Sequence, residues 1–323
     1  APLLVFAFCV WTGYRGIDFG RHWDEDRLTY AVSRSLETGV MLPRWYNYPS
    51  ITYDLTLLCL LPELVRFHSP LRASPSSFVW PSTPRANSAV KANKTREEFP
   101  IVRSASSAVV DSASSLTVCL QGMSDHARKE YLLRTTVTSH NFLLRVRRVF
   151  LVVSLLSVFW IYFLVLSWRK NWVEALLASS LLGLSWEVEY HARWIAPDVV
   201  MMQFGALTLM FLIRTQHAAR VFRREFWLLC SSLAAGFACG TKYQSGLLIL
   251  PIFLAAYYTS NIPCVTIRQL PWGLFLKLFA CFSFSYLLTT PGTILEPYKF
   301  IHGVTFEMNH YRRGHWGHTV SAG

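Results

Sequence analysis

The sequence has few charged residues for its length. Only 15% of its 323 residues are Asp, Glu, Lys or Arg, whereas soluble domains carry about 25%. Hydrophobic residues make up 52% of the chain and gather in long runs, of which 149–168 contains no formally charged residue. A helix of about 20 apolar residues spans the roughly 30 Å hydrocarbon core of a membrane. The shortage of charge therefore argues against an ordinary soluble protein and predicts an integral membrane protein.

Acidic residues are scarcer than basic ones, which gives a formal net charge of +12. In a membrane protein such an excess sets the orientation of the loops and contacts anionic lipid headgroups, so membrane lipids are expected partners and nucleic acid is not. The seven cysteines lack CxxC spacing, and most lie within apolar runs. We interpret them as small core residues that say nothing about redox compartment.

Charge-poor stretches predict an all-α polytopic membrane protein with seven spans. The expected spans are 2–14, 149–168, 172–185, 199–213, 226–239, 246–258 and 272–288. Because the chain opens inside an apolar run without Met or a basic leader, we expect the first span to be clipped rather than to be a signal peptide. Arginines and lysines follow every second span, which places those loops in the cytoplasm and the alternate loops on the outer or lumenal side.

The chain between the first two spans is long and has two parts: a stretch with apolar patterning, and then a Ser/Pro-rich basic stretch. Apolar residues at helical spacing in 26–39 predict an amphipathic helix that ends at Gly39. The apolar stretch 51–65 contains Asp54 and Glu63 and is short for a span, so we expect an interfacial or partly re-entrant helix. If it crossed the membrane, every later loop would change sides. The expected regions are 1–14 (clipped helix), 15–66 (outer loop with the acidic motif), 67–148 (weakly ordered Ser/Pro-rich basic insertion), 149–288 (six spans) and 289–323 (incomplete outer segment).

Ionisable residues beside the spans are candidates for function, because such positions are costly. The segment 22–26 presents three consecutive carboxylates, Asp24, Glu25 and Asp26, just past the first span. The alternative interpretation is structural: Asp26 caps the helix that follows, while the other two carboxylates are solvated.

Further charged residues are expected on the same outer face. Arg193 precedes Asp198, which opens a span directly after Pro197 and could simply complement the helix dipole. Lys242 lies between two later spans and could snorkel to the interface. Taken together, carboxylates and cations at one membrane boundary suit an anionic lipid-linked substrate.

These motifs resemble those of a known family. The sequence His22-Trp-Asp24-Glu25-Asp-Arg27, followed by Pro43-Arg-Trp-Tyr-Asn-Tyr-Pro49, resembles the first outer loop of GT-C glycosyltransferases of the protein O-mannosyltransferase and aminoarabinose-transferase branch, in which an Asp-Glu pair follows the first helix. Later motifs that resemble the family are Arg193-Trp-Ile-Ala-Pro-Asp198, Gly240-Thr-Lys242-Tyr243, and Pro291 to Tyr298 with His310-Tyr-Arg-Arg-Gly-His315. The departures are Trp23 where Pro is frequent, the insertion 67–148, and the absence of later spans.

The resemblance implies an inverting glycosyltransferase that moves a sugar from a polyprenyl-phosphate donor to a protein, lipid or glycan acceptor. The reaction would take place on the outer or lumenal face of a bacterial plasma membrane or of the endoplasmic reticulum. Asp24 would be the general base and Glu25 its partner in orienting acceptor or sugar. Arg193 and Lys242 would contact the leaving phosphate, which needs no proton where cations stabilise its charge. The other implied substrate-binding residues are His22, Arg27, His191, Asp198, Tyr243, His310 and His315.

No cofactor is implied with certainty, although members of the superfamily differ in their use of a divalent metal. Glu307, His310, His315 and His318 have the side chains of a carboxylate and imidazole site. We prefer the interpretation that they line the substrate cavity or lie on a polar loop.

Two other classes of protein fit the same composition. A transporter or flippase for a lipid-linked solute would also carry charges near its spans. The carboxylates lie in a loop rather than mid-helix, however, and the sequence has no evident internal repeat or pair of broken helices. A lipid-binding membrane protein without catalytic activity is the third option.

Overall fold

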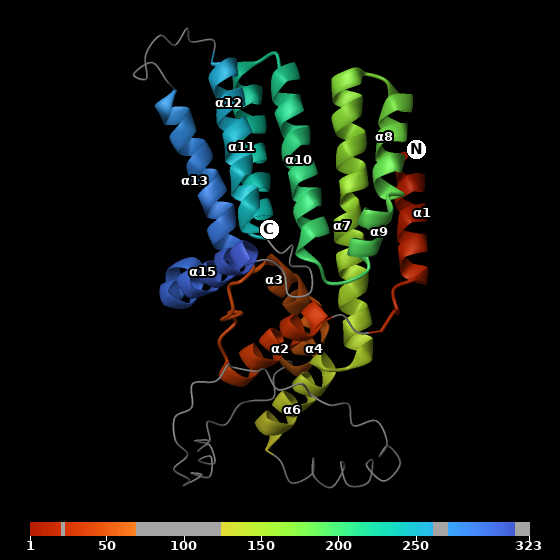
Figure 1. Ribbon diagram of the computed structural model, residues 1–323, viewed down its shortest axis with the longest axis vertical. Coiled ribbons are helices and arrows are strands. Elements are labelled where there is room, and N and C mark those ends of the chain that lie inside the picture. Colours follow the sequence, from red (N-terminus) through yellow and green to blue (C-terminus); the bar gives the residue numbers. More distant parts are fainter. Residues whose placement is uncertain (21–22, 69–123, 261–270, 314–323) are drawn as a thin grey trace.

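The computed structural model describes residues 1–20, 23–68, 124–260 and 271–313, and those residues form helices without any strand (Figure 1). The all-α fold expected from the sequence is therefore confirmed. In Figure 1 a bundle of roughly parallel helices occupies the upper part, and a second layer of helices lies at its lower end. The bundle helices are α1 (Pro2–Arg15), α7 (His140–Arg169), α8 (Trp172–Gly183), α10 (Pro197–His217), α11 (Val221–Cys239), α12 (Ile249–Thr259) and α13 (Trp272–Thr289).

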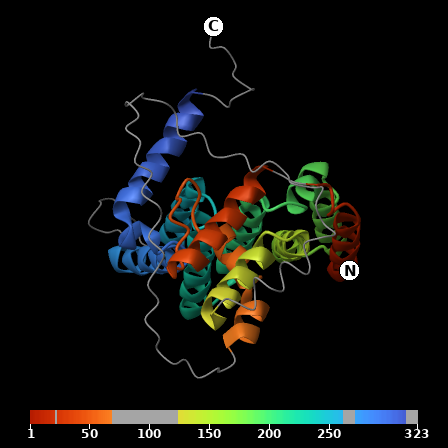
Figure 2. The same cartoon turned by 90° about the horizontal axis from the view of Figure 1, so that it is seen from below.

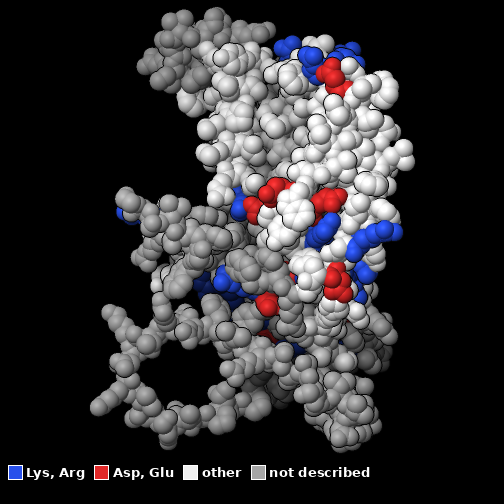
Figure 3. Space-filling model, turned by 45° about the vertical axis from the view of Figure 1, so that its right-hand side comes forward, with Lys and Arg blue, Asp and Glu red and all other residues white. Residues whose placement is uncertain are grey.

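Three of these helices are long and apolar enough to cross a membrane, namely α7, α10 and α13. The other four expected spans coincide with α1, α8, α11 and the pair formed by the short 3-10 helix η1 (Tyr243–Leu248) and α12. Figure 3 shows charged side chains at two levels of the visible face, with a belt of uncharged side chains between them. The protein is therefore embedded in a membrane, while crossing by the four remaining helices stays a prediction.

The helix α7 begins nine residues earlier than its apolar run. The Ser139 hydroxyl accepts a hydrogen bond from the backbone N–H of Phe142 at 3.2 Å and so caps the new start. The added turns bury Phe142 and Val146 against the second layer. A further helix, α6 (Asp125–Val137), precedes them. Within the range 67–148, residues 125–137 and 140–148 are thus helical, whereas 69–123 lie outside the described residues.

The second layer begins with α2 (Trp23–Thr38), which crosses the end of the bundle when the molecule is seen from below (Figure 2). Its expected apolar face is buried, since Leu28, Ala31 and Val32 are at most 8% exposed in a core shared with α3, α6 and α7. The stretch 51–65 is divided into α3 (Ile51–Leu58) and α4 (Leu61–His68), each of eight residues. Neither is long enough to span a membrane.

The remaining elements complete this end of the molecule. They are the short α9 (Trp186–Ala192), α14 (Gly292–Leu295) and α15 (Pro297–Arg313). In Figure 1 the lower ends of α1, α7, α10, α11 and α13 all face this layer. The loops expected on the outer side therefore share one end of the bundle, where the candidate site is built.

Candidate functional site

A buried ion pair joins the acidic motif to α7. The Glu25 carboxylate accepts hydrogen bonds from Arg147 Nε at 2.8 Å and from Arg147 Nη2 at 2.5 Å. Its Oε1 also accepts from the backbone N–H of Ile195 at 3.3 Å. The two side chains are 1% and 0% exposed. Charge-assisted two-point contacts of this kind are strong and directional, so they fix the first turn of α2 on the bundle.

Arg147 also orders the segment that leads into α2. Its Nη1 donates to the carbonyl oxygen of Ile17 at 2.8 Å, and its Nη2 donates to that of Gly20 at 2.5 Å. The guanidinium carbon lies 4.1 Å from the centre of the Phe19 ring. Arg147 therefore holds both sides of residues 21–22, which are not described themselves.

Sequence reasoning missed Arg147, although it singled out its partner. Three arginines occur close together at positions 145, 147 and 148. Arg145 pairs with Glu63 at 2.5 Å, and Arg148 is exposed and lies over the Tyr14 ring. Only Arg147 points into the core. Helical spacing alone could not identify Arg147, because the sequence does not show which face of α7 packs against α2.

Asp24 lies in the first turn of α2, directly before Glu25 in the chain. Neither its side chain nor any part of His22 is among the described residues. Asp26 is exposed. The alternative structural interpretation is wrong on two points: Asp26 cannot cap a helix that already begins at Trp23, and Glu25 is buried rather than solvated. Arg27 is exposed as well, and its guanidinium carbon lies 5.6 Å from the centre of the Trp45 ring.

A second ion pair joins α10 to the turn after α11. Lys242 Nζ lies 2.5 Å from Asp198 Oδ1, with the side chains 17% and 43% exposed. Asp198 follows Pro197 in the first turn of α10, as expected, so its charge also complements the helix dipole. Lys242 does not snorkel freely but is held by a carboxylate from the neighbouring helix.

A third cation, Arg193, lies beside the end of α1. Its Nη2 donates to Glu189 at 3.0 Å, and the same carboxylate accepts from the Thr12 hydroxyl at 2.6 Å. Arg193 approaches Gly16 so closely that a Cβ there would lie 2.6 Å from Nη1. The buried Arg193 Nε has no hydrogen-bond partner among the described residues. His191, on the same segment, lies 3.4 Å from Glu187.

The aromatic segment 43–49 is anchored to the C-terminal elements. The Tyr46 hydroxyl donates to Glu296 at 2.9 Å, and Tyr46 in turn accepts at its carbonyl from the Tyr243 hydroxyl at 2.9 Å. Burial favours protonation of Glu296, but hydrogen bonds from Lys299 and Tyr46 outweigh it and lower the pKa of this carboxyl. Burial and the adjacent carboxylate raise the pKa of Tyr46. Apart from the motifs that resemble the family, no sequence pattern predicts this network.

These contacts connect motifs that are far apart in the chain. Glu25 contacts Ile195, three residues before Asp198, and Asp198 binds Lys242. Two residues before Lys242, the Gly240 carbonyl accepts from the backbone N–H of Ile51 at 3.0 Å. The acidic motif, the 193–198 segment and the 240–243 turn therefore converge at one end of the bundle.

The C-terminal candidates are less closely connected to this centre. His310 stacks on Phe306 within α15, with ring centroids 6.2 Å apart. Glu307 has one buried carboxylate oxygen that accepts no hydrogen bond from any described residue. His315 and His318 lie outside the described residues. Among the residues that the structure does describe, no group of three or more His, Cys, Asp or Glu side chains is placed to hold a metal ion.

Comparison with known proteins gives a family. Neither the curated proteins nor the solved structures contain a match. The model of the family described as dolichyl-phosphate-mannose-protein mannosyltransferase matches residues 134–302, just over half of the chain. That range includes Arg147, Asp198 and Lys242 but begins after Asp24 and Glu25. The chain therefore belongs to the dolichyl-phosphate-mannose-protein mannosyltransferase family, a group of GT-C membrane glycosyltransferases.

Proposed function

We propose that the protein transfers a mannosyl unit from a polyprenyl-phosphate donor to a hydroxyl group of a protein acceptor. The family supports the donor class and the kind of acceptor. The observation that carries the location is the buried Glu25–Arg147 pair, which fixes the acidic motif at the same end of the bundle as Asp198 and Lys242. By the expected alternation of basic loops, this end faces the outside or the lumen.

In this proposal Asp24 is the general base of a single displacement. The acceptor oxygen attacks the anomeric carbon, the bond from that carbon to the phosphate oxygen breaks, and Asp24 takes the hydroxyl proton. The lipid phosphate leaves as an anion and the anomeric configuration inverts. A positioned base contributes roughly 10²–10⁴-fold to such a step.

Glu25 has a different role from the substrate-orienting one that the resemblance implies. Its carboxylate oxygens already accept hydrogen bonds from Arg147 and from Ile195. A carboxylate engaged in this way stabilises the turn that carries Asp24. We therefore assign Glu25 and Arg147 as positioning residues.

The cations near the site suit the donor phosphate, but each already has a carboxylate partner. Lys242 is paired with Asp198, and Arg193 is paired with Glu189. A phosphate that binds here therefore contacts cations that are already paired with carboxylates. The unsatisfied Nε of Arg193 supplies one donor that no described protein group uses.

The class of activity is tested with the purified full-length protein and radiolabelled polyprenyl-phosphate mannose. A peptide rich in Ser and Thr serves as acceptor. A mannosyltransferase releases free lipid phosphate and labels the peptide. Movement of intact labelled lipid across the vesicle membrane without cleavage would instead show a flippase. A protein that binds the donor but neither cleaves nor moves it would be a lipid-binding protein.

A further inference from the structure

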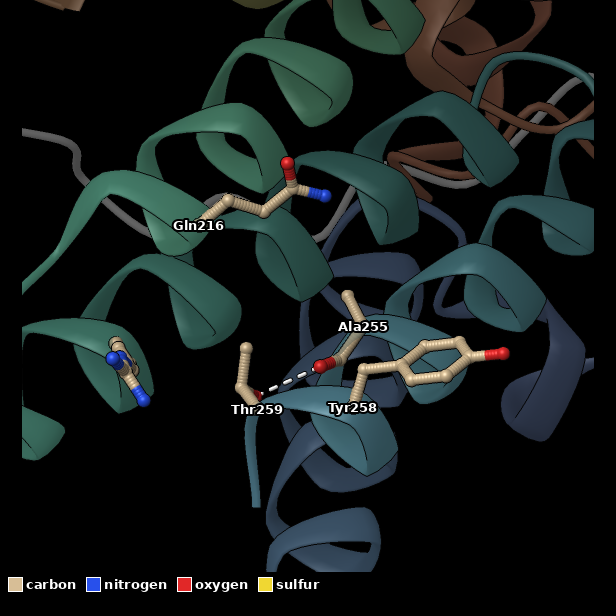
Figure 4. A pocket seen from close by; sticks show the side chains of 5 residues that line it. Gln216, Ala255, Tyr258 and Thr259 are labelled. Atoms are coloured by element: carbon tan, nitrogen blue, oxygen red, sulfur yellow. Dashed lines mark hydrogen bonds between the residues drawn. The ribbon is translucent and has the colours of Figure 1, made fainter. Parts of the chain in front are cut away.

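A cavity of about 350 Å³ opens at the end of the bundle opposite to the candidate site. It lies where the last turns of α10 and α12 meet the first turn of α11. Figure 4 shows Gln216 on one helix and the residues of α12 on a neighbouring one. The lining residues are Gln216, Arg224, Ala255, Tyr258 and Thr259.

The described lining residues offer hydrogen-bond donors, and none of them carries a carboxylate. Arg224 is half-buried, and its Nε donates to the Ala218 carbonyl at 2.8 Å, which holds the guanidinium at the cavity. The exposed Gln216 and Tyr258 add an amide and a hydroxyl group. Thr259 already donates its hydroxyl proton to Ala255 at 2.8 Å. The terminal N–H groups of this guanidinium have no hydrogen-bond partner in the part of the chain that the structure describes. Together with the neutral donors beside them, they suit a phosphate oxygen.

The surrounding charge is also positive. From 199 to 224 the sequence contains no Asp or Glu but four arginines, Arg214, Arg220, Arg223 and Arg224. Glu225 follows directly, but its carboxylate forms an ion pair with Lys277, whose Nζ lies 2.8 Å from Glu225 Oε1. Arg214, one turn before the end of α10, has a buried Nε that no described residue contacts by a hydrogen bond. The local field therefore attracts an anion.

Exposed apolar side chains accompany the arginines at this end of the bundle. Val221 and Phe222, at the start of α11, are 76% and 80% exposed, and Tyr258 is 70% exposed. Apolar side chains of this kind beside arginines at a helix end match the boundary between lipid headgroups and acyl chains. A soluble phosphate ester would gain nothing from them.

We propose that this cavity binds the phosphate group of an anionic membrane lipid, whose acyl chains pack on Val221 and Phe222. The site is separate from the proposed transfer reaction, because it lies at the other end of the bundle. It would hold α10, α11 and α12 together at that boundary.

Binding is measured by native mass spectrometry of the full-length protein in detergent, titrated with phosphatidylglycerol. Arg224→Gln is compared with Arg223→Gln, which removes the same charge one residue away from an exposed side chain that does not line the cavity. We expect Arg224→Gln to weaken binding roughly tenfold, the loss of about one charge-assisted hydrogen bond, and Arg223→Gln to change it less than about twofold. Equal weakening by both variants would show that binding depends only on the overall positive charge of this region, and would overturn the proposal.

Two further arms keep the test decisive. Gln216→Glu places a carboxylate at the cavity without touching the Arg224–Ala218 hydrogen bond, so it should weaken binding even if Arg224→Gln folds poorly. Glycerol 3-phosphate, which has the phosphate but no acyl chains, should bind far more weakly than phosphatidylglycerol. Equal binding of the two would overturn the lipid assignment, as would unchanged lipid binding in Gln216→Glu.

Discussion

Glu25 and Arg147 are 122 residues apart in the chain, yet they form a two-point ion pair in which both side chains are buried from solvent. Two buried charges are stable only while each compensates the other, and removal of one partner typically costs about 3–5 kcal/mol. The pair therefore links the fold of the second layer to the placement of Asp24.

The first prediction concerns this pair. Arg147→Met should lower the thermal unfolding temperature in detergent markedly, because Glu25 is left buried and uncompensated. The double variant Glu25→Leu with Arg147→Met should regain much of that stability, since no charge remains buried. Both variants should lose transferase turnover because Asp24 is no longer held.

The control is Arg148→Met, which removes an exposed arginine from the same turn of α7. Its unfolding temperature should stay close to that of the wild type. If Arg147→Met proves as stable as Arg148→Met, the buried pair does not anchor the second layer.

The second prediction concerns the base. Asp24→Asn keeps the size of the side chain but removes its basicity, so turnover should fall by roughly 10²–10⁴-fold while donor binding persists. Asp26→Asn changes an exposed residue two positions along the same helix and should have a small effect. Initial rates are compared at saturating acceptor and varied donor. Near-normal turnover in Asp24→Asn with a strong loss in Asp26→Asn would move the assignment to Asp26.

The third prediction concerns the cation at the 240–243 turn. Lys242→Ala should raise the donor KM and lower kcat together, because a phosphate contact would be lost from ground and transition states alike. Asp198→Asn keeps the Lys242 charge and removes its competing partner, so the donor KM should rise less than in Lys242→Ala. A larger KM increase in Asp198→Asn would show that Asp198, rather than Lys242, contacts the donor.

Absence of charge was enough to predict the all-α membrane fold, because a hydrocarbon core excludes unpaired charges whatever the topology. The bounds of α7 were harder to predict. Its first turns carry Arg145, Arg147 and Arg148, which look like loop residues in the sequence. In the structure Arg145 pairs with Glu63 and Arg147 with Glu25, both from the second layer. Their helical state depends on tertiary contacts that no local pattern records.

The candidate site was likewise predictable in its residues but not in their contacts. Local sequence marked Glu25, Asp198 and Lys242 as unusual charges beside spans, and the structure brings their segments together. The pairing of Lys242 with Asp198 depends on how α10 packs against α11, so it could not be read from spacing. The alternative interpretation of Asp26 as a helix cap is wrong because α2 starts earlier, at Trp23.

The last prediction concerns Asp54, a half-buried carboxyl group of α3 without an ion pair or side-chain hydrogen bond to any described residue. Burial raises the pKa of Asp54 from 3.8 to about 7, while an unfolded chain ionises Asp near pH 4. Between these values the folded protein binds more protons than the unfolded one, so this group's contribution to stability falls as the pH rises from about 4 to 7. Asp54→Asn removes the ionisable group.

We therefore expect Asp54→Asn to unfold slightly above the wild-type temperature at pH 5, where the loss of stability has only begun, and further above it at pH 8, where the loss is complete. The gain at pH 8 should be on the order of 1–3 kcal/mol, because water that reaches the half-buried carboxyl group screens part of the cost. Thermal unfolding in one detergent at both pH values measures the difference, and Asp26→Asn on the exposed face of α2 should show none. A stabilisation of equal size at pH 5 and pH 8 would mean that Asp54 is already ionised in the folded protein at the lower pH, and that its burial does not hold the proton.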